Sequence, residues 1–265
     1  MKFVIKLFPE ITIKSRPVRK QFINQLRRNI KNSLKYNGIA ATVQGQWDLI
    51  EAVIEDDSQE MEARSCLQRV TGIAKILTVK EHNFKTFDDI LDIAKDIYAD
   101  KIKGKTFCVR IKRTGDHDFR SIDIERYVGG GLLQHCEASG VNLHKPDYTV
   151  RMEIRKQRLL TISNINSGMG GYPLGTQDSV LSLISGGFDS NVTSYLTTRR
   201  GLLTHYLFFN LGGDAHEIGV KQVAHYLWQR YSISHSVRFV TVPFEGVVSE
   251  ILKNVDNSQM GVILK

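Results

Sequence analysis

The segment from Val180 to Arg200 constrains the fold more than any other part of this 265-residue chain. A short apolar run, Val180 to Ile184, precedes the string Ser-Gly-Gly-Phe-Asp-Ser at 185–190, and residues 191–200 can form a helix. Two glycines allow positive φ angles and a close ligand approach, and free amide groups at a helix start attract an anion. The pattern predicts a buried strand, a phosphate-binding turn and a helix, with a turn that only caps the helix as the alternative.

The same string excludes one phosphate loop and points to a metal ion. It lacks the lysine of Gly-x-x-x-x-Gly-Lys-[Ser/Thr], so it is not a Walker loop. A carboxylate at Asp189 would repel a phosphate unless a divalent cation lay between them, so we predict Mg²⁺ near Asp189. The string SGMGGYPLGT at 167–176 has no strand before it and no helix directly after it, which excludes a dinucleotide fingerprint. Its glycine and proline content predicts a linker.

The composition indicates a soluble protein of a reducing compartment. With 265 residues, of which 42% are apolar, the chain is long enough for two or three compact domains. It has no apolar run of the roughly eighteen residues that a membrane span needs, and residues 1–8 are too short for a signal peptide, so a cytoplasmic location is expected. Cys66, Cys108 and Cys136 are odd in number and widely spaced, which argues against disulfides and zinc and favours small buried side chains.

The positive charge is concentrated in two parts of the sequence. Residues 1–31 hold nine Lys or Arg and one acid, Glu10, although the whole chain has a net charge of only +8. A second basic cluster extends from Lys101 to Arg113 and continues to Arg126. Two separate basic surfaces indicate an extended polyanion such as a folded RNA, with a merely solvated basic face as the alternative. The candidate phosphate contacts are Arg27, Arg28, Lys31, Lys112, Arg113 and Arg120.

Hydrophobic periodicity predicts an α+β module at residues 1–77. Alternation at Lys2 to Phe8 predicts a strand, and apolar residues at four-residue spacing from Arg16 to Tyr36 predict an amphipathic helix with a basic outer side. The resulting order, βαββαβ, is that of a ferredoxin-like domain. The remaining elements of this order are strands at 41–44, 49–54 and 74–80 and a helix at 59–69.

A second α+β module is predicted at residues 78–167. The glycine triplet 129–131 is its unusual feature, because each glycine costs a helix about 1 kcal/mol relative to alanine. The triplet predicts an interruption of the helix at 120–136 and tight packing there, with a close approach of RNA as the alternative. The other expected elements are a helix at 86–99, a strand at 106–111 and a hairpin at 148–154 and 159–162.

The last module, at 177–265, has the pattern of an incomplete α/β parallel sheet. Only three strands fit, at 180–184, 202–209 and 237–242, with a helix at 217–230. The pair His216-Glu217 is not part of a His-Glu-x-x-His zinc motif, because residue 220 is valine. We interpret the pair as a helix cap or a helix contact, with a position beside a nucleotide as the alternative.

The string SGGFDS after a buried strand resembles the SGGxDS loop of the ATP pyrophosphatase family. Members of that family split ATP between its α- and β-phosphates and adenylate an oxygen of their substrate. The resemblance implies that Leu183 and Ile184 lie beside the adenosine and that Asp189 is the catalytic and metal-binding residue. The residues implied around the phosphates are Ser185, Gly186, Gly187, Asp189 and Ser190.

Longer strings extend the resemblance over essentially the whole chain. They are MKFVIKLFPEITIKS, GKTFCVRIKRTGDHDF, SIDIERYVGGGL, LSLISGGFDS, FFNLGG and AHEIGVKQVAHYLW. Together they resemble the tRNA 4-thiouridine synthetases, also called tRNA sulfurtransferases. That family implies a ferredoxin-like domain at 1–77, an RNA-binding THUMP domain at 78–167 whose family profile begins near residue 61, a linker at 168–176 and a partial ATP pyrophosphatase domain at 177–265.

The resemblance also implies a reaction and its participants. The first two domains would bind tRNA, and the third would use ATP and Mg²⁺ to adenylate the 4-oxygen of a uridine. Sulfur from a persulfide carrier, supplied by a cysteine desulfurase, would then replace that oxygen. A homodimer and a link to thiamine biosynthesis are further expectations, although some members serve thiamine synthesis through a rhodanese domain that this sequence lacks.

The end of the chain departs from the family pattern. Residues 261–265 resemble the start of another apolar element, which predicts C-terminal truncation. Lys265 aligns with a basic residue that contacts ATP in the family, whereas the family's sulfur-handling cysteine lies further downstream. Two alternatives therefore stay open beside the sulfurtransferase, namely a non-catalytic tRNA-binding fragment and an enzyme that adenylates a small molecule.

Overall fold

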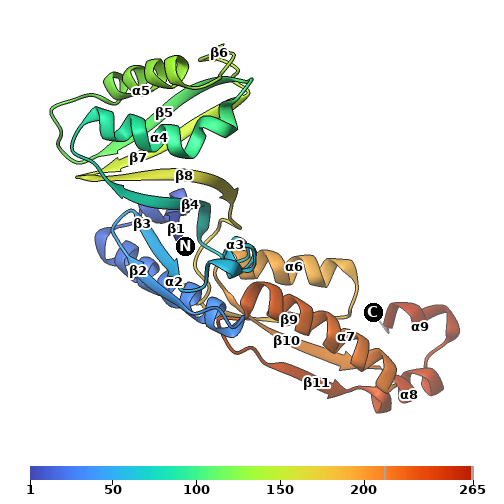
Figure 1. Cartoon of the computed structure of the whole chain (residues 1–265). Helices are drawn as coiled ribbons and strands as arrows, with labels where there is room; N and C mark the ends of the chain where they lie inside the picture. The colour runs from blue at the N-terminus through green and yellow to red at the C-terminus, as the bar shows by residue number, and fades with distance from the viewer. Residues whose placement is uncertain (212, 264–265) are drawn as a thin grey trace. The chain divides into compact units, whose positions relative to one another are not determined.

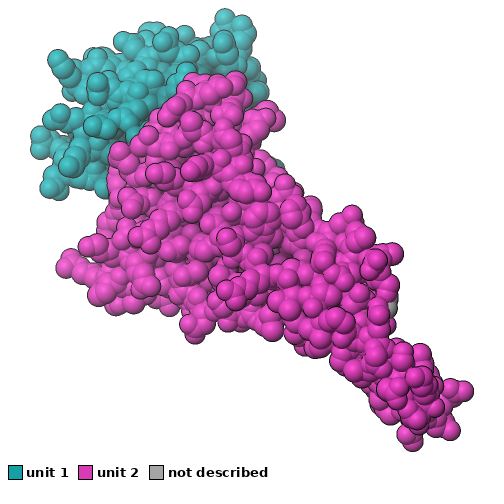
Figure 2. All heavy atoms as spheres, turned by 90° about the horizontal axis from the view of Figure 1, so that it is seen from below, with its two compact units in different colours: residues 1–4, 77–166 teal, residues 5–76, 167–265 magenta. Residues whose placement is uncertain are grey.

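The computed structural model describes residues 1–211 and 213–263, which form two compact units (Figure 1). Unit 1 consists of residues 1–4 and 77–166, and unit 2 consists of residues 5–76 and 167–265 (Figure 2). The ferredoxin-like elements and the glycine-loop elements thus belong to the same unit, whereas the second predicted module forms most of the other. In the part of the chain that the structure describes, no helix combines the length and apolarity needed to cross a lipid bilayer.

The predicted βαββαβ order of the first module is confirmed. Helix α2 buries Phe22, Leu26 and Ile30 at the predicted four-residue spacing. Strands β2 and β3 pair antiparallel, and the strand order is β2-β3-β1-β4. The elements are β1 (Lys2–Leu7), α1 (Pro9–Thr12), α2 (Arg16–Tyr36), β2 (Ala41–Gly45), β3 (Leu49–Ile54), η1 (Asp57–Gln59), α3 (Glu60–Gln68) and β4 (Ile73–Asn83).

The three predicted strands of the last module form a parallel sheet in the order β11-β10-β9. Helices α6 and α7 contact each other and cover one face of this sheet, around a core that includes Tyr206, Phe208 and Val220 (Figure 1). The strand predicted as buried is exposed on one face, because Leu181 and Leu183 of β9 are exposed, as is Val240 of β11. The elements are β9 (Ser179–Leu183), α6 (Phe188–Arg199), β10 (Leu203–Asn210), α7 (Asp214–Leu227), the π-helix η2 (Trp228–Ser232), β11 (Phe239–Pro243), α8 (Glu245–Asn254) and α9 (Asn257–Ile263).

The glycine-rich segment 168–176, expected to be a linker without folded structure, is held by backbone hydrogen bonds at several points. The amide of Gly170 donates to the Ile73 carbonyl over 2.8 Å, and the amide of Tyr172 donates to the Arg199 carbonyl over 3.1 Å. Gly171 has a φ of +73°, and a Cβ there would overlap the Arg199 carbonyl oxygen. We call residues 168–176 the clasp, because they join the start of β4 to the end of α6.

Unit 1 contains a second α/β arrangement, with the strand order β4-β8-β7-β5-β6. Strand β5 pairs parallel with β7, and β7 pairs antiparallel with β8. The Tyr98 ring is fully buried in this core, and its hydroxyl donates to the Arg151 carbonyl over 2.9 Å. The elements after β4 are α4 (Phe87–Ile102), β5 (Thr106–Thr114), α5 (Ser121–His135), β6 (Gly140–Val141), β7 (Tyr148–Arg155) and β8 (Arg158–Ser167).

The glycine triplet does not interrupt its helix, contrary to the sequence prediction. Helix α5 runs continuously from Ser121 to His135. A Cβ at Gly131 would overlap the Leu91 side chain of α4, whereas one at Gly130 would meet nothing within 4 Å. Close helix packing therefore explains Gly131, which is the packing role expected for the triplet.

Candidate functional site

The loop after β9 places a helix start, with no side-chain cap, at the edge of the parallel sheet. Gly186 has a φ of +81°, and Gly187 is the N-cap of α6 without any side-chain cap hydrogen bond. The helix begins at Phe188, three positions before the predicted start at Asn191, so Asp189 lies in its first turn. The exposed Asp189 carboxylate thus lies beside amides that a helix leaves without internal partners.

Two side chains shape this loop from within. The Ser190 hydroxyl donates to the Gly187 carbonyl over 3.2 Å and lies 3.4 Å from the amide nitrogen of Ser185, which donates to it. The Asn191 amide group donates to the Gly186 carbonyl over 3.5 Å. The Asn191 Oδ1 atom is buried and has no hydrogen-bond partner among the described residues. Sequence reasoning had not included Asn191 in the site.

A hollow of about 420 Å³ lies beside the loop at the carboxyl ends of β9 and β10. Parallel α/β sheets bind their ligands at this edge. The predicted residues Leu183, Ile184 and Ser185 come together in its wall, with Leu183 62% exposed and Ile184 3% exposed. The remaining lining residues are Leu207, Phe208, Phe209, Leu211, His216, Phe244 and Ile263.

The aromatic part of this wall was not predicted. His216 and Phe208 meet edge to face with ring centroids 5.2 Å apart, and Phe209 contacts Phe244 at 5.3 Å. One feature of the sequence could have indicated it. Phe208 and Phe209 lie near the carboxyl end of a predicted parallel strand, where such sheets bind ligands. The hollow is partly apolar and is open to the glycine loop through Ser185.

Glu217 fixes helix α7 to the end of β10 and to the middle of β11. Its carboxylate accepts hydrogen bonds from Asn210 Nδ2 over 3.1 Å and from Thr241 Oγ over 2.9 Å, and it pairs with Lys221. The Lys221 contact and the Thr241 hydroxyl hold the pKa of Glu217 below its usual value. The helix contact that we expected for this pair thus applies to Glu217, while His216 lines the hollow.

Two further predictions concern Asp189 as a metal ligand and Lys265 as an ATP contact. Within residues 1–211 and 213–263, no group of three or more His, Cys, Asp or Glu is placed to hold a metal ion. Asp189 can therefore supply a single carboxylate. Lys265, predicted to contact ATP, lies outside the described residues.

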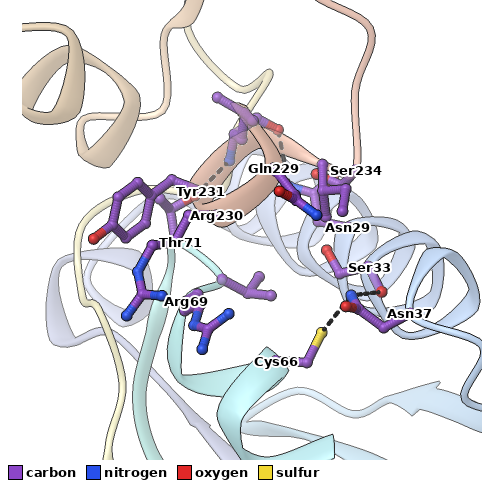
Figure 3. A pocket seen from close by; sticks show the side chains of 13 residues that line it. Asn29, Ser33, Asn37, Cys66, Arg69, Thr71, Gln229, Arg230, Tyr231 and Ser234 are labelled. Carbon is purple, nitrogen blue, oxygen red and sulfur yellow. Dashed lines mark hydrogen bonds between the residues drawn. The ribbon is translucent and has the colours of Figure 1, made fainter. Parts of the chain in front are cut away.

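A separate small polar cavity lies in unit 2 where α2, α3, the clasp and η2 meet (Figure 3). Its volume of about 20 Å³ is enough for a water molecule, which needs roughly 10–15 Å³ on this measure, and is too small for a nucleotide. The Cys66 thiol at its edge lies 3.5 Å from Asn37 Nδ2, and burial raises the pKa of Cys66 to about 11. Cys66 is thus a buried thiol, as predicted, and not a ready nucleophile.

The candidate RNA-binding side chains differ in their surroundings. On α2, Arg27, Arg28 and Lys31 are exposed, whereas Arg19 is buried and pairs with Asp48 over 2.6 Å.

In unit 1, Lys112 is exposed, but Arg113 donates to the His117 carbonyl over 3.0 Å. Arg120 pairs with Asp123 over 3.0 Å at the start of α5. The cations on α2 are therefore less engaged in contacts within the protein than the predicted cations of unit 1.

The fold and loop together define a class of protein with a ferredoxin-like part, a second α/β unit and a glycine-rich loop at a helix start on a parallel sheet. Family models match all three parts, namely the ThiI ferredoxin-like domain at residues 2–76, the THUMP domain at 84–162 and the thiamine biosynthesis protein (ThiI) at 175–265. The tRNA sulfurtransferase of Escherichia coli strain K12 / DH10B is 57% identical over 265 residues, and that of Shewanella woodyi is 54% identical over 270 residues. All three parts of the chain thus match models that describe ThiI or THUMP domains, and the relatives that match over its whole length are tRNA sulfurtransferases. Each alignment covers 100% of this chain and 55% of the relative, so the chain spans about half the length of these relatives.

Two solved structures share the fold. A 4-thiouridine synthetase in complex with RNA and with bound ATP has a TM-score of 0.80 and 23% identity, and the match covers 100% of this chain and 67% of that one. The protein PH1313 from Pyrococcus horikoshii Ot3 has a TM-score of 0.79 and 23% identity, with 96% of this chain and 82% of that one covered.

Proposed function

We propose that this chain contains the RNA-binding and ATP-binding parts of a tRNA uridine 4-sulfurtransferase. The observation that carries the proposal is the glycine loop of Ser185 to Gly187, which leaves the start of α6 without a side-chain cap and opens onto a partly apolar hollow. An anion at the helix start and a flat ring in the hollow are the two halves of a nucleotide. The relatives named tRNA sulfurtransferase and the ATP-bound, RNA-bound structural neighbour support this interpretation.

In this proposal the triphosphate lies at the first turn of α6. The positive φ of Gly186 lets the backbone turn there, and the Ser190 hydroxyl holds the turn in shape through the Gly187 carbonyl. Leu183 and Ile184 border the adenosine in the hollow. Mg²⁺ fits this site, because it is commonly held by one or two carboxylates together with substrate phosphates, and Asp189 supplies one carboxylate. When bound, the ion would neutralise phosphate charge.

The reaction then has three steps. The 4-oxygen of a uridine attacks the α-phosphorus of ATP, the bond between the α-phosphorus and the bridging oxygen breaks, pyrophosphate leaves, and the base loses its N3 proton. A carbonyl oxygen is a poor leaving group, but the same oxygen bonded to AMP is a good one. In the second step the terminal sulfur of a persulfide attacks carbon 4 and AMP leaves with the oxygen, so the base carries the sulfur as a mixed disulfide. A second thiol, proposed as the reductant, then attacks the inner sulfur, the S–S bond breaks, a disulfide forms between the two thiol groups, and the thiocarbonyl remains on the base. A cysteine desulfurase is the proposed origin of the transferred sulfur. In the adenylation step, the amide dipoles at the start of α6 are already fixed in place to stabilise charge on the phosphoryl group.

The proposed RNA contacts act mainly on phosphates. Arg27, Arg28 and Lys31 lie exposed on one helix, and Lys112 lies exposed in unit 1. Such contacts position the RNA without reading bases, so recognition rests on the shape of the tRNA. The protein is proposed to act as a homodimer in the cytoplasm.

The test measures pyrophosphate release by the chain with ATP and tRNA. Asp189→Asn is expected to lower this release by about 100-fold, the effect of removing one electrostatic contact to a transferring group. Asp214→Asn is the matched control, because Asp214 is also a carboxylate in the first turn of a helix on the same sheet, and it should stay within about twofold of the unchanged protein.

Three outcomes would contradict the proposal. Equal release by Asp189→Asn and Asp214→Asn would remove the loop from the site. Normal tRNA binding without any rise in melting temperature on adding ATP would favour a non-catalytic RNA-binding fragment. Release that needs no tRNA, in a protein with no salt-sensitive tRNA binding, would favour an enzyme that adenylates a small molecule.

A further inference from the structure

A second hollow, of about 450 Å³, lies between α7 and the beginning of β11 in unit 2. It shares no lining residue with the hollow beside the glycine loop, so the proposed ATP site does not account for it. Its size falls in the range of about 300–1,000 Å³ that is usual for small-ligand sites. We call it the ring pocket; it is lined by Tyr206, Lys221, Ala224, His225, Trp228, Ser236, Val237 and Phe239.

The walls of the ring pocket consist largely of flat rings. Tyr206 is buried and lies beside Phe239, with ring centroids 6.5 Å apart. His225 is exposed and lies 5.4 Å from the Trp228 ring. Lys221, which also pairs with Glu217, places its ammonium 5.9 Å from the Phe239 ring. Partly exposed ring faces next to a cation are the features that stack single-stranded bases with little preference for sequence.

The tryptophan wall continues directly onto helix α2. Trp228 meets Tyr36 edge to face with ring centroids 5.6 Å apart. Asn32, one turn before Tyr36, donates to the Ser234 carbonyl over 3.3 Å. The last turns of α2 therefore lie next to Trp228, a wall residue of the ring pocket, although no residue of α2 lines the pocket itself.

These turns carry a row of cations. Arg28, Lys31 and Lys35 are exposed, and at 100° per residue they project within an arc of about 60°. Among residues 1–211 and 213–263, no carboxylate forms an ion pair with any of the three. An unpaired row of this kind favours a polyanion, whose backbone can follow the helix while one of its bases leaves the strand. The charge thus selects a nucleic-acid strand as the occupant over a neutral aromatic molecule or an apolar peptide.

We propose that the ring pocket takes one unpaired base of the bound RNA, whose backbone phosphates lie along Arg28, Lys31 and Lys35. This inference rests on the proposed function in that the strand belongs to the tRNA. It adds a base-stacking contact to an interface that would otherwise consist of phosphate contacts. It requires a base that is free to leave its neighbours, so the contact is with a single-stranded part of the tRNA.

The test uses the fact that the chain has only two tryptophans. In the Trp47→Phe variant, which keeps an aromatic ring over Arg19, Trp228 is the sole indole reporter. A single-stranded hexaadenylate should quench the fluorescence of Trp228 in a saturable manner. Ser236→Phe, which fills the pocket, and His225→Ala, which removes a wall, should each weaken hexaadenylate binding about tenfold, measured by the anisotropy of a labelled strand. Tyr226→Ala is the matched control, because Tyr226 is an exposed ring on the same helix but not a lining residue.

Each outcome bears on the pocket separately from the proposed function. Hexaadenylate binding without Trp228 quenching, or equal binding by Ser236→Phe, His225→Ala and Tyr226→Ala, would overturn the inference even if pyrophosphate release with tRNA is normal. Quenching of Trp228 by AMP alone at the concentrations needed for hexaadenylate would also overturn it, because the cation row would then contribute nothing. Saturable quenching that Ser236→Phe weakens would support the pocket even in a protein that releases no pyrophosphate.

Discussion

Gly171 in the clasp offers the sharpest test of how unit 2 is held together. Its φ of +73° lies in the left-handed region, and a Cβ there would overlap the Arg199 carbonyl oxygen and lie 3.1 Å from Arg199 Cγ. Gly171→Ala therefore adds backbone strain of about 1–2 kcal/mol and overpacking of about 1–3 kcal/mol. The expected loss in the free energy of unfolding is about 3.5 kcal/mol, the middle of that combined range.

A matched variant separates the two costs. Gly38 has a φ of +72°, and a Cβ there would meet nothing within 4 Å, so Gly38→Ala carries the strain alone. Urea unfolding followed by tryptophan fluorescence reports on both, since both lie in unit 2. Gly171→Ala should lose about 2 kcal/mol more than Gly38→Ala, the size of the overpacking cost. Equal losses would show that the clasp is not packed as closely as the structure places it.

Two further substitutions test other buried contacts. Tyr98→Phe should lower the stability of unit 1 to urea by about 2 kcal/mol, because the Tyr98 hydroxyl donates to the Arg151 carbonyl and accepts from the Ile162 amide over 3.1 Å. An unchanged midpoint of urea unfolding would show that the hydroxyl does not stabilise unit 1. Burial lowers the pKa of His235 from its ordinary 6.5. Below pH 6.5 the folded state therefore binds fewer protons than the unfolded state. The contribution of His235 to stability is full above pH 6.5 and is lost as the pH falls below it. His235→Gln should flatten that part of a melting-temperature profile between about pH 8 and 5, and an unaltered slope would rule out the histidine as its source.

Local sequence predicted the parts of the site that depend on neighbouring residues. An apolar run followed by two glycines was enough to place β9, the turn at Gly186 and the helix that follows. The start of that helix was missed by three residues, because Ser190 and Asn191 are side chains typical of N-caps, whereas the cap is Gly187. The aromatic side of the hollow depends on β9 pairing with β10, a register that no local pattern contains.

The clasp shows a second limit of prediction from composition. Glycine and proline serve equally in a loose linker and in a segment pressed against other backbone, and the two differ only in what lies opposite. Here the opposing groups are the carbonyls of Ile73 and Arg199. Both residues are distant in sequence from the clasp. The same ambiguity affected Gly131, whose neighbour Leu91 lies on another helix.

Helix α7 connects the two hollows of the parallel sheet. His216 lines the hollow beside the glycine loop, and Lys221 and His225 line the ring pocket further along the same helix. Val220, between them, would lie 3.2 Å from a Cβ at Gly186, so the helix also supports the loop itself. Because Glu217 fastens this helix to Asn210 of β10 and Thr241 of β11, one set of contacts holds both walls in position. A ligand that shifted α7 at one hollow would therefore change the width of the other, which would give the proposed ATP and the proposed stacked base a physical route for influencing each other's binding.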